Sequence, residues 1–173
     1  DQRTHIKSLL PAELETVLQE MGEPKYRAKQ IFRWLHLGVT SFEEMSDLSK
    51  NLRAKLEERF CLTVPQILRK QVSAKDGTIK YLFGLEDGNS IESVLMKYEH
   101  GYSICISTQA GCKMGCVFCA SFDPAKSRNL TAAEIIDEII FAQKDSGVRI
   151  SNIVLMGTGE PLDNYTNVRQ FLR

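Results

Sequence analysis

Three of the five cysteines in this 173-residue sequence fall within residues 111–119, with the spacing C-x3-C-x2-C. Cys112, Cys116 and Cys119 can present three thiolates to one face of a metal centre, whereas a structural zinc site or an ordinary [4Fe–4S] cluster takes four protein ligands. Three cysteines with no fourth nearby therefore indicate a cluster with one iron left open to another ligand. The competing interpretation, three free cysteines buried in a core, agrees less well with the glycines and the short spacing, which are typical of a tight loop.

The residues on both sides of this loop alternate between strand and helix patterns. Residues 103–108 read as a short strand, and residues 131–134 form the capping box of a helix that carries an isoleucine stripe. A buried apolar strand is expected over residues 153–156, followed by the Gly-Thr-Gly-Glu-Pro turn of residues 157–161 and by a helix from Asn167. This alternation is typical of the opening of a parallel α/β barrel, in which the chemistry lies at the carboxyl ends of the strands. We therefore expect the cysteine loop and the turn to lie together.

Residues 1–64 carry helical patterns instead. Apolar residues recur at helical spacing, between glycines and capping residues, over residues 11–21, 25–37, 41–44 and 49–60. The second of these helices has a basic edge, because three of its cations fall at i, i+4 and i+8: Lys25, Lys29 and Arg33. This edge suits contact with RNA phosphates and equally suits a solvated face, so the pattern alone leaves both interpretations open.

The intervening residues 65–102 change to the period of a β-sheet. Strands are expected over residues 66–73, 78–85 and 90–98, with Asp-Gly turn signals between them, which predicts an antiparallel meander. The third strand carries Glu92 between two apolar residues. A carboxylate in such a strand most often faces solvent.

The composition excludes several classes of protein. Basic and acidic residues each number 22, so any nucleic-acid binding must come from local patches and not from a global charge. No apolar run approaches the roughly 20 residues of a membrane span, and no signal-peptide pattern opens the sequence. The clustered cysteines do not form a disulfide framework, and thiolate ligation requires a reducing compartment. We expect a cytoplasmic protein with no membrane partner.

The motifs together resemble a known family. Phe118 directly before the last cysteine makes the C-x3-C-x2-C stretch resemble the radical S-adenosylmethionine (SAM) enzymes. Three wider segments narrow the resemblance to the rRNA adenine C2-methyltransferases of the RlmN/Cfr type, namely residues 105–112, the Arg-Asn-Leu-Thr of 128–131 and the Met-Gly-Thr-Gly-Glu-Pro-Leu of 156–162. Residues 22–35 resemble a characteristic segment of that family's N-terminal helical domain, which engages RNA.

This resemblance implies an α/β chain in three parts. Residues 1–64 would be a helical RNA-binding accessory domain, 65–102 an antiparallel β extension, and 103–173 the first β/α units of a partial radical SAM barrel. It also implies a [4Fe–4S] cluster on Cys112, Cys116 and Cys119, whose open iron chelates the amino and carboxylate groups of SAM. Gly159 and Glu160 match the positions that hold the methionine amino group of SAM.

The reaction implied is methylation of adenine carbon 2 in 23S rRNA, with tRNA as a second candidate substrate. Cleavage of one SAM gives a 5′-deoxyadenosyl radical, which takes a hydrogen from a methyl group carried on a protein cysteine, and the resulting carbon radical adds to the adenine. Glu92 matches the glutamate that accepts a proton, and Cys105 matches the cysteine that resolves the protein–RNA crosslink by forming a disulfide. An electron donor such as a flavodoxin-type reductant is an implied partner, and we expect a monomer.

Two features depart from the family pattern. The methyl-carrying cysteine lies near the family's C-terminus, and this sequence has no candidate for it, so we expect a part of a longer enzyme that is inactive alone. Residues 121–127 lack the glycines usual in the family, and Cys61 matches no motif and is expected in the core. The alternatives are an RNA-binding module with a structural or vestigial iron–sulfur loop, a Cfr-type methyltransferase acting on carbon 8, and a simple iron–sulfur electron carrier.

Overall fold

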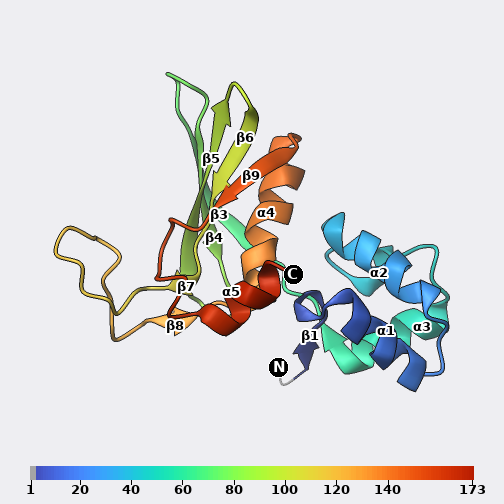
Figure 1. The fold of residues 1–173 in the computed structure, drawn as a ribbon. Helices are drawn as coiled ribbons and strands as arrows, with labels where there is room; N and C mark the ends of the chain where they lie inside the picture. Colours follow the sequence, from blue (N-terminus) through green and yellow to red (C-terminus); the bar gives the residue numbers. More distant parts are fainter. Residues whose placement is uncertain (1–2) are drawn as a thin grey trace. The chain divides into compact units, whose positions relative to one another are not determined.

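A computed structural model describes residues 3–173. The chain divides into two compact units, one that ends at Thr63 and one that runs from Val64 to Leu172 (Figure 1). No helix within residues 3–173 is long and apolar enough to cross a bilayer.

The N-terminal unit is a small helical bundle. Its elements are η1 (Ile6–Ser8), α1 (Pro11–Glu20), α2 (Tyr26–His36), η2 (Phe42–Glu44) and α3 (Lys50–Arg59). All but η1 form where the sequence predicts helices, and together they bury one apolar cluster that includes Leu18, Ile31 and Leu52. A short parallel pair that the sequence did not predict, β1 (Thr4–His5) with β2 (Phe60–Cys61), joins the two ends of the unit. Cys61 is buried, as expected.

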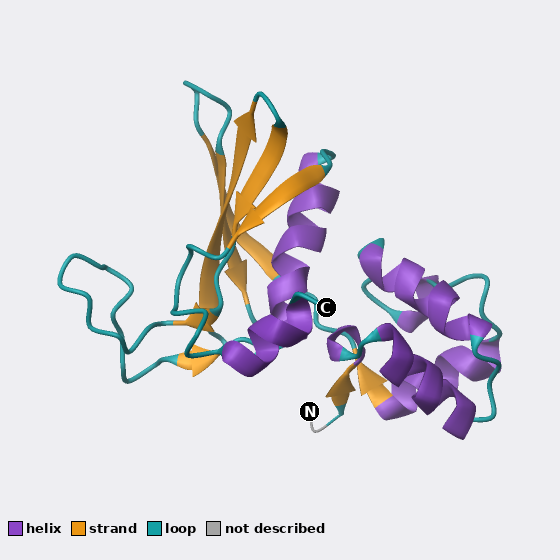
Figure 2. Ribbon diagram, viewed as in Figure 1, coloured by secondary structure: helices purple, strands orange, loops and turns teal. Residues whose placement is uncertain are grey.

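The second unit is built on one five-stranded sheet (Figure 2). Its strands, in spatial order, are β3 (Gln66–Val72), β4 (Ile79–Gly84), β5 (Ser90–Tyr98), β6 (Gly101–Cys105) and β9 (Ile150–Val154). The first three pairs are antiparallel, and β6 pairs with β9 in parallel. The expected meander and the expected first barrel strands therefore belong to the same sheet.

Helix α4 (Ala132–Ser146) covers one face of this sheet (Figure 1). The Thr131 hydroxyl and the Glu134 carboxylate form the predicted capping box at its start, and Gly147, with φ 70°, ends it in the left-handed conformation. The isoleucines of α4 pack against alternate residues of β5 such as Ile91 and Leu95, which are almost fully buried. A second helix, α5 (Tyr165–Phe171), begins two residues before its predicted start.

The prediction of a buried apolar strand over residues 153–156 is wrong in this chain. Strand β9 occupies residues 150–154, and its neighbourhood is exposed: Ile153 is 45% exposed, Val154 37% and Met156 81%. The reason is that, within residues 3–173, β9 lies at the edge of the sheet and has β6 as its only neighbour. An apolar run identifies a strand built for burial but does not say which elements will cover it.

Candidate active site

The carboxyl ends of β6 and β9 meet, as the α/β pattern predicts, and their pairing continues beyond both strands. The Ile106 N–H donates to the Val154 carbonyl at 3.0 Å, and the Gly157 N–H donates back to the Ile106 carbonyl at 3.0 Å. The Thr108 N–H then donates to the Thr158 carbonyl at 2.9 Å. Residues 106–109, which lead into the cysteine loop, are thus in direct contact with the turn of residues 157–160.

Glycine is required at two positions of this turn. A Cβ atom on Gly157 would lie 2.6 Å from the Ile106 carbonyl oxygen, and one on Gly159 would lie 2.6 Å from the Gln109 Cβ. Gly159 also has φ +105°, a conformation that other residues rarely adopt. The predicted Gly-x-Gly motif therefore has a measurable cause, the close approach of two backbone segments.

The predicted cofactor residue Glu160 lies half-buried at the end of the turn. Its N–H donates to Gln109 Oε1 at 2.9 Å, and its carboxylate accepts the Leu162 N–H at 3.0 Å. The other end of the Gln109 amide donates to Asp163 at 2.7 Å, and Asp163 also pairs with Lys113 at 3.1 Å. A buried glutamine and one ion pair thus connect the turn to the first residues of the cysteine loop.

The cysteine loop itself projects from the sheet as a long excursion (Figure 1). Its base is the short antiparallel pair β7 (Gln109–Ala110) and β8 (Arg128–Asn129). Cys112 is buried beside this base, whereas Cys116 and Cys119 are exposed and lie in one turn closed by the Cys119 N–H to the Cys116 carbonyl at 3.0 Å. Next to them Phe118 is 95% exposed.

The donor set of the loop fits an iron–sulfur cluster in number and in kind. Gly111 and Gly115, with φ near +70°, give the loop sharp turns on both sides of Cys112. However, within residues 3–173 no three His, Cys, Asp or Glu side chains lie close enough together to ligate one metal. No disulfide joins any of the five cysteines, all of which lie within the described residues. Gathering the three sulfurs therefore requires a local rearrangement of the exposed part of the loop, as is common where metal binding and folding are coupled.

Glu92 and Cys105 project from the sheet face opposite α4. Cys105 pairs with Val94 across β5 and β6, and Glu92 lies two residues from Val94, so all three side chains share that face. The Glu92 carboxylate is exposed, as expected, and pairs with Lys80 on β4 at 2.7 Å. Burial raises the pKa of the Cys105 thiol, although a hydrogen bond from the Met156 backbone opposes this shift.

The sequence reasoning missed the residues that hold these segments together. Ser107, Gln109 and Glu138 are almost fully buried and bond segments far apart in the chain. The sequence offers one signal for Glu138, which lies on the isoleucine-rich side of its predicted helix. A carboxylate in such a position is rarely buried without a partner. Ser107 and Gln109 carried no local signal, because their partners lie on other strands and loops.

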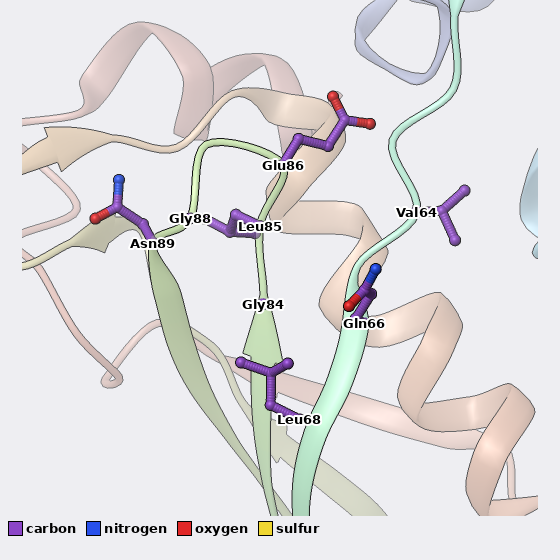
Figure 3. A pocket seen from close by; sticks show the side chains of 8 residues that line it. All are labelled: Val64, Gln66, Leu68, Gly84, Leu85, Glu86, Gly88 and Asn89. Atoms are coloured by element: carbon purple, nitrogen blue, oxygen red, sulfur yellow. The ribbon is translucent and has the colours of Figure 1, made fainter.

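A cavity of about 300 Å³ lies elsewhere in the second unit, at the start of β3 and the turn between β4 and β5 (Figure 3). Leu68 and Gly84 lie next to each other in its lining. The lining contains none of the predicted catalytic, cofactor-binding or metal-binding residues.

Comparisons with known proteins show what the chain is similar to. Residues 4–62 match the family model of the ribosomal RNA large subunit methyltransferase N-terminal domain. Two proteins described as probable dual-specificity RNA methyltransferase RlmN are similar over 99% of this chain. The protein from Alkaliphilus oremlandii is 55% identical, and the match covers 50% of its length. The protein from Lachnoclostridium phytofermentans is 53% identical, and the match covers 49% of its length.

A solved structure described as a radical SAM methyltransferase from Sphaerobacter thermophilus superposes with a TM-score of 0.87 at 40% identity. The match covers 98% of this chain and 51% of that one. The chain therefore belongs to the RlmN family, an enzyme family, and spans about half the length of the curated relatives it matches.

Proposed function

We propose that this chain is part of a radical SAM enzyme that methylates carbon 2 of an adenine in 23S rRNA and in tRNA. The observation that carries the proposal is the hydrogen-bonded contact between residues 106–109 and the turn 157–160, which joins the two motifs that such chemistry needs. The methyl-cysteine route requires a further cysteine that this chain does not supply. Its activity is therefore proposed for the longer protein.

In the proposed site Cys112, Cys116 and Cys119 hold a [4Fe–4S] cluster, which when bound supplies the electron that cleaves SAM. Gly159 lets the backbone approach the methionine end of SAM closely, because it has no Cβ. The Glu160 carboxylate pairs with the ammonium group of that end in a charge-assisted hydrogen bond. Gln109 holds its backbone N–H, and the Leu162 N–H holds its carboxylate, so the group is oriented before SAM arrives.

Glu92 and Cys105 act on the substrate side of the proposed reaction. Glu92 accepts the proton lost by the adenine ring, and Lys80 orients its carboxylate. The raised pKa of Cys105 favours the thiol form near neutral pH, so the group stays uncharged until it attacks the crosslink. Because both side chains share one sheet face, a single bound base can reach both.

The predicted helical accessory domain, residues 1–64, is proposed to bind the RNA. Lys25, Lys29 and Arg33 are exposed along α2, and such a stripe suits successive phosphates. Arg27 on the same helix is engaged with Gln30 and Asp47 and is therefore not part of the stripe. We expect that changing Lys25, Lys29 and Arg33 together to glutamine weakens RNA binding and reduces its salt dependence.

A second candidate, an RNA-binding module without a working cluster, is favoured by the divergence of the three loop sulfurs. Anaerobic reconstitution with iron and sulfide separates the two functions. The proposed enzyme binds a cluster whose spectrum changes on adding SAM, and Cys112→Ala, Cys116→Ala and Cys119→Ala together abolish both. RNA binding without any SAM response in the wild-type chain would instead support the binding module.

A further inference from the structure

Glu138 is a carboxyl group buried behind the proposed site. It projects from α4, is 1% exposed, and its Oε2 atom accepts a hydrogen bond from the Ser107 N–H at 3.0 Å and another from the Ser93 hydroxyl. Its Oε1 atom has no hydrogen-bond partner within the part of the chain that the structure describes. A buried carboxyl group is costly, so its retention calls for a reason beyond packing.

The partner of Glu138 is a junction between separate parts of the site. Ser107 is fully buried, and its hydroxyl donates to the Glu92 backbone carbonyl at 2.8 Å. The Ser107 hydroxyl oxygen also accepts a hydrogen bond from the Thr158 N–H at 3.0 Å. One side chain thus connects the strand that carries Glu92 to the turn that carries Gly159 and Glu160.

The chemical state of Glu138 follows from its surroundings. Burial raises the pKa of its carboxyl well above the ordinary value, against the hydrogen bonds from Ser107 and Ser93, and the charges of Glu134 and Asp137 raise it further. Burial therefore favours the neutral form of this carboxyl group. An amide has the same shape and can accept the same two hydrogen bonds.

We propose that Glu138 is a positioning residue that, through Ser107, holds the turn of residues 157–160 against the strand that carries Glu92. The expected effect on SAM binding rests on the proposed function. The hydrogen-bonded link from Glu138 through Ser107 to the turn does not depend on that function. Glu138 itself touches neither SAM nor the base.

The test measures hydrogen exchange in the full chain, without cluster or SAM. Glu138→Met removes the acceptor while keeping the size of the side chain, so exchange should accelerate about tenfold in peptides covering 105–110 and 156–162. Glu138→Gln keeps the acceptor and should exchange at the wild-type rate. Wild-type rates in Glu138→Met, or equal acceleration in both variants, would overturn the proposal.

A second variant keeps the test decisive if Glu138→Met fails to fold. Ser107→Ala removes the acceptor of the Thr158 N–H but leaves the backbone N–H at position 107 on Glu138. Exchange should therefore accelerate in 156–162 and stay unchanged in 105–110. Acceleration in neither peptide would contradict the assignment of Ser107 as the junction.

The consequence for SAM is measured separately on reconstituted protein. Glu138→Met should bind the cluster normally and require about tenfold more SAM for the spectral change, whereas Glu138→Gln should match wild type. An unchanged SAM requirement in Glu138→Met would refute the functional consequence. No SAM response in the wild-type chain would refute the proposed function and leave the exchange result standing.

Discussion

The cysteine loop and the Gly157–Glu160 turn are two halves of one proposed site, and they are built in opposite ways. The turn is held from several sides, by Ser107, by Gln109 and by the backbone of Ile106. The loop is held near its base, by the β7–β8 pair and the Lys113–Asp163 ion pair, while Cys116, Cys119 and Phe118 face solvent. The difference indicates that the turn, which is proposed to bind SAM, is preformed, whereas the loop, which is proposed to ligate iron, would be organised by the metal itself.

Iron loading should therefore order the cysteine loop and leave the turn of residues 157–160 unchanged. We expect reconstitution to slow amide exchange in residues 112–122 about a hundredfold, because thiolate ligation links three points of the loop. Exchange in the turn should change little. The two peptides are compared in one exchange experiment, and equal protection of both would show that the turn is not preformed.

Adding a methyl group at Gly159 in the turn should lower the free energy of unfolding more than adding one at Gly115 in the loop. Gly159→Ala meets both a positive φ and a contact at 2.6 Å, so we expect about 2 kcal/mol or more of lost unfolding free energy. Gly115→Ala meets a positive φ but no contact nearer than 3.6 Å, and should cost about 1 kcal/mol.

Urea unfolding followed by circular dichroism measures both variants. Trp34, the one tryptophan of the sequence, reports the N-terminal unit by fluorescence and serves as an internal control. If the two alanine variants lost equal stability, the contrast between a packed turn and an open loop would be wrong.

Removing the amide that connects the two halves should have a similar or smaller effect. Gln109→Leu leaves the Glu160 N–H without its acceptor in a buried place, and we expect a cost of about 1–3 kcal/mol. The matched control is Gln71→Leu on the exposed strand β3, which should stay within about 0.5 kcal/mol of wild type. Equal effects from both changes would speak against a bridging role for Gln109.

The smallest effect concerns the base of the loop, where Arg128 contacts Asp87 and Glu134. The Arg128 hydrogen bond lowers the pKa of Asp87 to about 2, from 3.8. A lowered pKa in the folded state stabilises the fold above about pH 4, and this contribution disappears as the pH falls from 4 to 2. Because the side chain is 39% exposed, we expect less than about 1 kcal/mol.

Thermal unfolding of wild type and Asp87→Asn between pH 6 and pH 2 measures this contribution. The wild-type advantage should shrink over that interval. A constant difference between the two proteins at every pH would exclude the ion pair as its cause.

Local patterns in the sequence were sufficient for most of the elements. The capping box at Thr131, the glycine that ends α4 and the alternation along β5 are read within a few residues, and each appears where expected. The contact between the cysteine loop and the turn also followed, because parallel neighbouring strands bring their carboxyl ends together. The roles assigned to Glu92, Cys105, Gly159, Glu160 and the three loop cysteines stay predictions.

The sequence by itself determined the kinds of element, the donor set of the loop and the family. Only the tertiary structure decided that β9 is an exposed edge, that Glu92 and Cys105 share a face, and that Ser107 joins Glu138 to the turn. The physical reason is the range of the interactions. Caps, turns and periodicity act between near neighbours, whereas these features depend on hydrogen bonds and pairings between segments that lie far apart in the chain.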